Sequence, residues 1–171
     1  MQTEMSCALN SLCQETQSTL FMLLTAAFNI LLCRYTGDKD ICIGTPIANR
    51  NREETEPLIG FFVNSLVLRT DLHDDPQFTQ LLTQLRKTTL EAYNHQDVSF
   101  DQLVEILNPV RATAHAPLFQ VMLALNNALI DDVELPGLTL RELETAGTTA
   151  KNDLRLAIIE KNGILHCSLE Y

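Results

Sequence analysis

GFFVNSLVLRTDL, at residues 60–72, is the stretch that decides the fold of this chain. Two alternating sets of side chains run along it, and both are mostly apolar: Phe62, Asn64, Leu66 and Leu68 on one face, and Phe61, Val63, Ser65 and Val67 on the other. β-Branched and aromatic residues favour strands, and a strand that is apolar on both faces is usually covered on both sides. The stretch therefore predicts an interior strand of a sheet.

Helical patterns precede and follow this strand in the sequence. Residues 19–35 are apolar almost all round and are followed by a Thr-Gly stop signal, which predicts a helix surrounded by protein. After the strand, Asp75 and Pro76 have the residue types of an N-cap and a first helical position. We expect the helix that they begin to run to about Asn94, since apolar side chains recur in it every three or four residues.

The remaining segments are mostly strand-like. Residues 41–46 predict a short strand that leads into an irregular polar loop at 47–60. Four further strands are expected at 118–126, 138–144, 154–160 and 164–171, with an Asn-Gly hairpin turn between the last two. This order predicts a mixed sheet with packed helices, in the α/β (α+β) class.

Residues 92–107, AYNHQDVSFDQLVEIL, contain the residue types of a nucleophilic triad. Ser99 followed by Gln102 is also a capping-box pattern, which predicts that the Ser99 hydroxyl bonds backbone N–H groups at the start of a helix. A triad is recognised by three-dimensional geometry and not by neighbouring positions in the sequence. We therefore interpret His95 and Asp97 as residues that hold a turn, not as catalytic ones.

Charge and hydropathy exclude several partners. The 22 acidic and 12 basic residues give a net charge of −10, which repels the phosphates of nucleic acids. The basic residues are scattered, so no strip of them attracts an anionic membrane. The most apolar stretch, residues 20–32, is shorter than the roughly 20 residues that cross a bilayer, and the N-terminal residues lack the pattern of a secretory signal. We expect neither nucleic acid nor membrane as a partner.

The five cysteines include no CxxC pair and follow no regular spacing, so we expect neither a metal site nor a disulfide framework. Cys33, Cys42 and Cys167 lie in apolar segments and are interpreted as small core residues. These features favour a reducing cytoplasm. The four histidines are dispersed, and His166 is expected beside the core.

The chain contains no P-loop, GxGxxG, GxSxG or HExxH motif, which excludes the common enzyme classes that carry them. Glu53, Glu54 and Glu56 share a polar loop with two arginines and are interpreted as a salt-paired surface. Asn64 most needs a partner, because an unbonded amide on a buried strand costs about 1–3 kcal/mol. Two interpretations stay open: an amide bonded to a neighbouring loop, or a polar contact to a substrate in a tunnel.

Four longer segments occur in a particular order, at residues 19–69, 93–107, 111–125 and 150–171. In this order and spacing they resemble the C-terminal half of the condensation domains of non-ribosomal peptide synthetases. The resemblance covers residues 15–171.

The resemblance implies one lobe of a two-lobed fold similar to chloramphenicol acetyltransferase. In that fold, phosphopantetheine arms of carrier domains enter a tunnel between the lobes from opposite sides, and the acceptor amine attacks the donor thioester; no cofactor is bound. The family's signature is HHxxxDG, whose second histidine is taken to act as general base or to position the amine. The signature is absent, because no two histidines are adjacent. We therefore expect residues 1–171 to be a partial condensation domain, its C-terminal lobe without the lobe that carries HHxxxDG.

Matches to the family's motifs identify the candidate site residues, and none of them is expected to be catalytic. Arg50, Asn64 and Gln120 are expected in the substrate tunnel or its motifs. The matching structural residues are Gly44, Pro46, Asn49, Gly60, Arg69, His95, Gln96, Asp97, Arg111, Pro117, Phe119 and Asp153. Ser99 stands where the family usually has proline, and this departure favours capping over catalysis.

Two functions of different classes follow. The first is the C-terminal lobe of an amide-forming condensation domain, inactive alone; whether the isolated chain is an enzyme is left open. The alternative is a non-catalytic remnant or docking module that binds carrier domains or a partner lobe. A CoA-dependent acyltransferase is disfavoured, because no histidine lies in the context of one. The face that would meet the absent lobe is expected to expose an apolar patch of more than a few hundred Å² and to promote self-association.

Overall fold

The computed structural model describes residues 3–50, 52–109, 116–126, 138, 150–161 and 163–171. The helices and strands assigned within these ranges are α1 (Thr3–Glu15), α2 (Leu20–Thr36), β1 (Asp40–Ile47), the 3₁₀ helix η1 (Glu53–Thr55), β2 (Asn64–Asp71), α3 (Phe78–Asn94), α4 (Phe100–Leu107), β3 (Val121–Asn126), β4 (Leu154–Lys161) and β5 (Ile164–Glu170).

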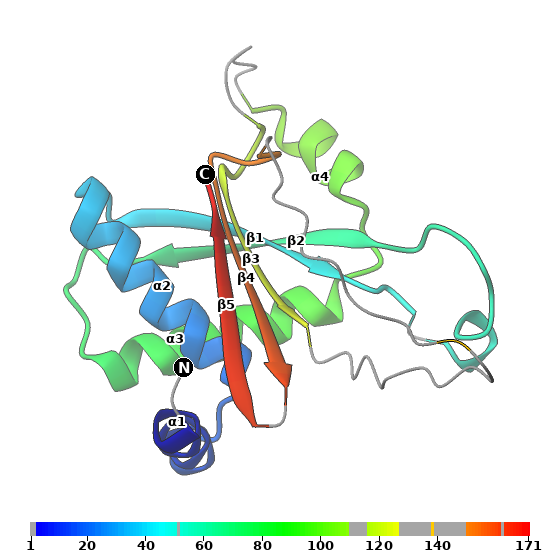
Figure 1. Ribbon diagram of the computed structural model, residues 1–171. Helices are drawn as coiled ribbons and strands as arrows, with labels where there is room; N and C mark the ends of the chain where they lie inside the picture. The colour runs from blue at the N-terminus through cyan, green and yellow to red at the C-terminus, as the bar shows by residue number, and fades with distance from the viewer. Residues whose placement is uncertain (1–2, 51, 110–115, 127–137, 139–149, 162) are drawn as a thin grey trace.

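The described strands form one mixed sheet in the order β2-β1-β3-β4-β5. The pairs β1–β2 and β4–β5 are antiparallel, whereas β1–β3 and β3–β4 are parallel. α2 packs on α3 and contacts β1, while α3 contacts β2, so the two helices lie together against this end of the sheet (Figure 1). The predicted α/β architecture, a mixed sheet with packed helices, is confirmed.

The core lies between α2, α3 and one face of the sheet. Its buried members include Met22, Leu23, Ala26 and Phe28 from α2, Leu81, Leu82 and Leu85 from α3, and Ile41, Ile43 and Leu123 from β1 and β3. Burying each large side chain contributes roughly 1.5–3 kcal/mol. Because successive side chains of a strand point to opposite faces, Asp40, Cys42, Gly44 and Pro46 of β1 lie on the other face. We call this side, turned away from α2 and α3, the distal face.

The prediction of an interior strand at residues 60–72 is wrong. β2 begins at Asn64 and pairs only with β1, at the edge of the described sheet. The apolar residues ahead of it lie in a loop, where Phe61 is 92% exposed and Val63 is 50% exposed. Apolar alternation could not distinguish an interior strand from an edge strand that follows an apolar loop. It indicates that a surface is to be covered, but not which element covers it.

The prediction of Asp75 as an N-cap is also wrong. α3 begins at Phe78 and is capped by Gln77, whose N–H donates to Gln80 Oε1 at 2.9 Å in a reciprocal capping box. Asp75 has a φ of 50° and donates its N–H to the carbonyl of Leu72 at 3.2 Å. It therefore closes the turn before the helix. The expected end of the helix at Asn94 is confirmed.

α2 has both expected ends but is not surrounded by protein. Thr19 caps its start by accepting the N–H of Met22 at 3.3 Å, and Gly37 ends it with a φ of 79°, in the left-handed region that favours glycine. Leu31 and Tyr35 are 50% and 85% exposed, so one side of the helix is open. No single described helix is both long and apolar enough to cross a membrane; residues 4–15 and 20–36, bent by 104°, pass that test only as a pair.

The later strands agree with the sequence where they are described. β3 and β5 lie within the expected segments 118–126 and 164–171, and β4 runs one residue beyond the expected segment 154–160. Gly163, with a φ of 72°, lies in the turn between β4 and β5. Residues 139–144 of the expected strand at 138–144 lie outside the described residues.

Ser99 caps α4 as predicted, and its removal gives a first test. Ser99 Oγ accepts the N–H of Gln102 at 3.3 Å, and Gln102 Oε1 accepts the N–H of Ser99 at 3.2 Å. Ser99→Ala is expected to lower the free energy of unfolding by about 1 kcal/mol, the usual cost of losing an N-cap side chain. Denaturant unfolding measures this change; an unchanged midpoint would show that the capping box does not stabilise α4.

Candidate functional site

Asn64, the first residue of β2, bonds the turn between α3 and α4 with its whole side-chain amide. Nδ2 donates to the carbonyl oxygens of Gln96 at 3.0 Å and Val98 at 2.8 Å, and Oδ1 accepts the N–H groups of Phe100 at 3.0 Å and Ser65 at 2.9 Å. An amide side chain has two donors and one oxygen that accepts two bonds. These four bonds therefore use its full capacity. The geometry corresponds to the first of the two interpretations, an amide bonded to a neighbouring loop.

Phe100, held at its N–H by Asn64, leads to a second contact. Its ring meets the ring of Phe119 edge to face, with centroids 5.4 Å apart. Phe119 is 5% exposed and lies over Gly44, where an added Cβ would come within 2.3 Å of the ring. Only glycine leaves room for this close packing. We call Gly44, Asn64, Phe100 and Phe119 the motif corner, because three of the four segments that carry the family resemblance meet there.

Arg50 organises the loop between β1 and β2. Its Nη1 donates to the carbonyl oxygens of Thr55, Glu56 (3.2 Å) and Leu58 (2.8 Å), and its guanidinium carbon lies 4.2 Å from the centroid of the Phe62 ring. Arginine commonly stacks on aromatic faces in this way. The side chain is thus directed into its own loop. Gly60 lies beside the same ring, since an added Cβ would be 3.0 Å from Phe62.

The HQD stretch forms the corner between α3 and α4. His95 is the C-cap residue of α3, and its side chain and that of Asp97 are exposed. Gln96 is half-buried and donates its N–H to the carbonyl of Tyr93 at 3.3 Å, while its own carbonyl accepts from Asn64. The Ser99 hydroxyl is occupied by its bond from the N–H of Gln102. These positions agree with a structural turn.

A pocket of about 470 Å³ opens at the start of β1 and β3. It is lined by Leu32, Thr36, Asp38, Asp40, Ile41, Cys42, Gln120, Val121 and Asp153. Gln120 is exposed, and its Nε2 donates to the carbonyl of Ala116 at 3.1 Å. Burial raises the pKa of the Cys42 thiol, and the nearby Asp40 charge raises it further while Arg69 lowers it. The thiol is therefore protonated at neutral pH and is a poor nucleophile.

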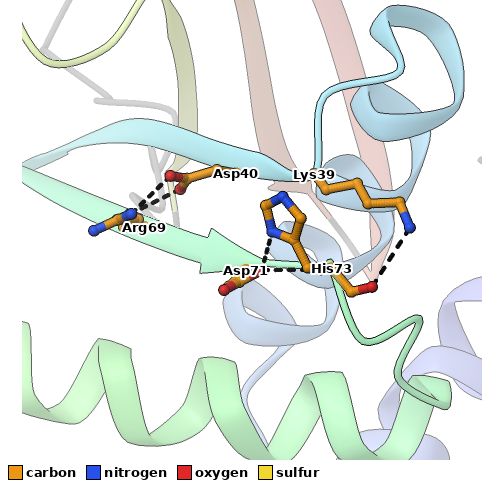
Figure 2. A network of polar contacts seen from close by, with 5 residues as sticks. All are labelled: Lys39, Asp40, Arg69, Asp71 and His73. Atoms are coloured by element: carbon orange, nitrogen blue, oxygen red, sulfur yellow. Dashed lines mark hydrogen bonds and ion pairs between the residues drawn. The ribbon is translucent and has the colours of Figure 1, made fainter.

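The polar groups beside this pocket pair with one another. Arg69 donates to both carboxylate oxygens of Asp40, from Nε at 2.8 Å and from Nη2 at 2.7 Å. His73 contacts Asp71 through Nδ1 at 2.6 Å and donates its N–H to the same oxygen at 2.9 Å, and Lys39 reaches the His73 carbonyl at 3.5 Å (Figure 2). The hydrogen bond from Arg69 lowers the pKa of Asp40, and the bonds from the His73 backbone and ring lower the pKa of Asp71.

The Arg69–Asp40 pair predicts a pH dependence. Because the pKa of Asp40 is lower in the folded state, its contribution to stability is complete above the unfolded value of about 4 and is lost as pH falls through the folded value. Arg69→Met is therefore expected to destabilise the protein slightly at neutral pH and less in acid. The pair is exposed, so salt should reduce the effect. Urea unfolding of both proteins across this pH range tests it; a constant difference would contradict this assignment.

The remaining site residues are placed as follows. Asn49 has a φ of 52° just after β1, and Pro46 pairs with Ser65 of β2. The carbonyl of Pro117 accepts the N–H of Phe119 at 2.9 Å in the turn before β3. Asp153 lines the pocket, and Arg111 lies outside the described residues.

Several other expectations need correction. Cys33 is half-buried and packs against the core, as predicted, but Cys167 is exposed and Cys42 is half-buried on the distal face, whereas Cys13 is a buried core residue. His166 lies on edge strand β5 and is exposed, because the outer positions of β5 are open. Among the described residues no group of three or more His, Cys, Asp or Glu side chains could hold a metal ion.

The sequence reasoning missed the pocket residues Asp38, Asp40 and Cys42. Asp40 and Cys42 alternate with the apolar Ile41 and Ile43, and this period of two was a signal that they share the opposite face of a strand. The pairing of Asp40 with Arg69 was not visible, because it depends on the antiparallel register of β1 and β2.

Comparison with known proteins identifies the family. The family model of the condensation domain matches residues 1–171. The chain belongs to the condensation-domain family. It is 48% identical over 170 residues to a linear gramicidin synthase of Brevibacillus parabrevis, an alignment that covers 98% of this chain and 3% of that protein. Malpinin synthetase of Mortierella alpina is 46% identical over 164 residues, which cover 96% of this chain and 2% of that protein. The chain thus spans only a small part of these relatives.

Solved structures agree with this family. A four-domain non-ribosomal peptide synthetase bound to AMP and glycine superposes with a TM-score of 0.88 at 23% identity, over 99% of this chain and 14% of that one; at this identity the likeness concerns the fold. The X-domain from teicoplanin biosynthesis, solved in complex with OxyB, has a TM-score of 0.76 at 31% identity, over 90% of this chain and 33% of the solved chain. Together with the family model and the synthetase relatives at 46–48% identity, these likenesses support a condensation domain of the non-ribosomal peptide synthetase type. The chain spans about one third of the length of that solved X-domain.

Proposed function

We propose that the chain is the C-terminal lobe of a condensation domain that forms amide bonds between carrier-bound acyl and aminoacyl thioesters. It supplies one wall of the substrate tunnel, and the general base comes from a second lobe that carries HHxxxDG. One observation carries this proposal: the family matches across all 171 residues, yet no two histidines in them are adjacent. Within the described site, the side chains of His73, His95 and His166 are exposed and lie outside the motif corner.

The distal face of the sheet has the properties of such a wall. Most of its residues are half-buried or exposed; only Gly44 and Ala124 are buried. They mix apolar with polar groups: Asp40, Cys42, Gly44 and Pro46 of β1, Ser65, Val67 and Arg69 of β2, Met122 and Ala124 of β3, and Arg155, Ala157 and Ile159 of β4. A largely apolar surface with a few polar groups suits a thioester-linked substrate arm.

α4 supports the need for a covering partner. Its apolar residues Phe100, Leu103, Val104 and Leu107 follow the spacing of one helical face, yet none is buried, and Leu107 is 57% exposed. Ile106 beside them is 76% exposed. We propose that a second lobe or a carrier domain covers this surface, and that the isolated chain self-associates through it.

The proposed roles of the three tunnel candidates differ. The side chains of Arg50 and Asn64 bond backbone groups of the protein itself, so both shape the wall without reaching the substrate. Gln120 also bonds the backbone, because its Nε2 donates to the carbonyl of Ala116, but unlike the half-buried Arg50 and Asn64 it is exposed at the rim of the pocket, where the phosphopantetheine arm would arrive. No cofactor of its own is required for the lobe in this role. Five free thiols fit a reducing cytoplasm.

Reconstitution tests the proposal. The chain is mixed with a separately produced N-terminal lobe that carries HHxxxDG, together with donor-loaded and acceptor-loaded carrier domains. We expect a condensed product by intact mass only when both lobes are present, and its loss when the second histidine of HHxxxDG is replaced by alanine. Product formation that is unaffected by that replacement would contradict a general base in the second lobe.

A second function is a docking module without catalysis. The observation that favours it is the relative at 31% identity, a teicoplanin X-domain solved in complex with the protein OxyB. Titration of carrier domains against the chain separates the two functions. Tight binding with no turnover on addition of any N-terminal lobe would favour docking.

A further inference from the structure

The hydrogen bonds from the Asn64 amide to the turn at residues 96–100, here called the Asn64 clamp, are linked by packing contacts to the wall of the pocket. Asn64 donates to the carbonyls of Gln96 and Val98 and accepts the N–H of Phe100, so it bonds the backbone on both sides of the Ser99 cap. The start of α4 is thus fixed by two independent devices, the capping box and the Asn64 amide. The amide joins positions 32 to 36 residues apart, so it ties an edge strand to a distant turn.

The second link runs from Phe100 to the pocket. The ring of Phe100 rests against Phe119, which fills the space above Gly44, and the next residue, Gln120, lines the pocket. Val121 pairs with Ile43 in the parallel register of β3 and β1. Gln120 therefore stands next to the position of Cys42, and both line the same pocket.

We propose that Asn64 is a positioning residue: by holding the turn at residues 96–100 it fixes the ring of Phe100, and through Phe119 it sets the Gln120 and Cys42 side of the pocket. Asn64 itself touches no substrate in this role. The inference deepens the proposed function, because it names the residue that shapes the wall, but its first two tests need no activity.

Cys42 reports on the wall directly. Its thiol is half-buried, and burial is the largest cause of its raised pKa, so both access and ionisation slow its alkylation. A displaced Phe119 segment would expose the thiol. Peptide-resolved mass spectrometry measures the rate at Cys42 separately from the exposed Cys7 and Cys167.

Three variants of the full chain separate the steps. Asn64→Asp keeps the acceptor oxygen but replaces the donating Nδ2 with a second oxygen, which cannot donate to the carbonyls of Gln96 and Val98. Phe100→Leu leaves the Asn64 clamp in place and removes the ring contact. Ile158→Val, in the buried part of β4, is the matched control for mild loss of stability outside the motif corner.

Hydrogen exchange and alkylation give the expected results. Asn64→Asp should raise amide exchange in α4 and the alkylation rate of Cys42, each by about tenfold. Phe100→Leu should raise alkylation of Cys42 but leave exchange at the turn of residues 96–98 near that of the wild type, and Ile158→Val should change neither. If Cys42 reacts at the wild-type rate in both Asn64→Asp and Phe100→Leu, the inference is overturned.

An activity measurement completes the test. In the two-lobe mixture, Asn64→Asp should lower kcat about tenfold with little change in KM for the loaded carrier, since a misplaced wall misorients a substrate that still binds. Asn64→Ser, which keeps one hydrogen-bonding oxygen, should recover part of the loss. A change in KM alone would contradict a positioning role. If the wild-type mixture makes no product, the proposed function fails, while exchange and alkylation still decide the inference.

Discussion

Replacing Gly44 by alanine is expected to destabilise the protein by about 2–3 kcal/mol, the upper part of the range for overpacking a well-packed interior. The added Cβ would lie 2.3–2.6 Å from three atoms of the Phe119 ring, closer than any non-bonded contact allows. The ring cannot move freely, because it is buried and packed edge to face on Phe100. Denaturant unfolding measures the loss, provided that the slope of the unfolding free energy against denaturant concentration is the same in both proteins.

A double-mutant cycle shows whether Phe119 causes this loss. Phe119→Ala alone should cost about 3–5 kcal/mol, as truncation of a buried aromatic does. With the ring absent, Gly44→Ala should cost at least about 1 kcal/mol less than in the wild type. Gly163→Ala, at a φ of 72°, is the control, since no atom of the described part of the chain lies within 4 Å of its added Cβ. Its cost should be the same with or without the Phe119 ring; strict additivity at Gly44 would contradict the contact.

Thr70→Val is expected to cost about 1–3 kcal/mol, because it leaves a buried amide donor without its partner. Asn29 Nδ2 on α2 donates to Thr70 Oγ1 on β2 at 3.1 Å, and the two residues are 0% and 1% exposed. The Asn29 oxygen already has no hydrogen-bond partner among the described residues. This bond therefore joins the helix layer to the edge strand across a buried interface.

The double variant tests whether the unsatisfied donor causes the loss. Asn29→Leu with Thr70→Val removes both polar groups, so it should be more stable than Thr70→Val alone. Thr83→Val is the control on the exposed face of α3, where the expected change is within about 0.5 kcal/mol. Thermal unfolding of the four proteins measures these differences. Equal stability of Thr70→Val and the wild type would show that the buried bond contributes nothing.

Local signals predicted the helix ends and most strands of this fold. Gly37 and Ser99 act through residues three or four positions away, so their roles were predicted from the sequence. The Thr19 cap of α2 is equally local, but it was not predicted. The position of β2 at the edge was not predictable, because strand order depends on contacts between distant segments. Asp75 failed as a cap for a different, local reason: Gln77 and Gln80, three residues apart, form a capping box that competes with the Asp-Pro pattern.

The candidate site was only partly predictable. Sequence identified Asn64 as a polar residue in need of partners, and the structure supplies four. The contact between Phe119 and Gly44 could not be foreseen, since it depends on the parallel pairing of β1 with β3. The absence of HHxxxDG, by contrast, is a property of the sequence itself, and the proposal of a general base in a second lobe rests on it.

In the proposed function this lobe shapes a tunnel but holds no catalytic base. Intact-mass analysis of donor-loaded and acceptor-loaded carrier domains, after incubation with the purified chain alone, measures whether that is so. We predict that condensed product forms no faster than in a mixture without the chain. Multiple turnovers by the chain alone, abolished by replacing His95 or His166, would contradict the assignment of the base to a second lobe.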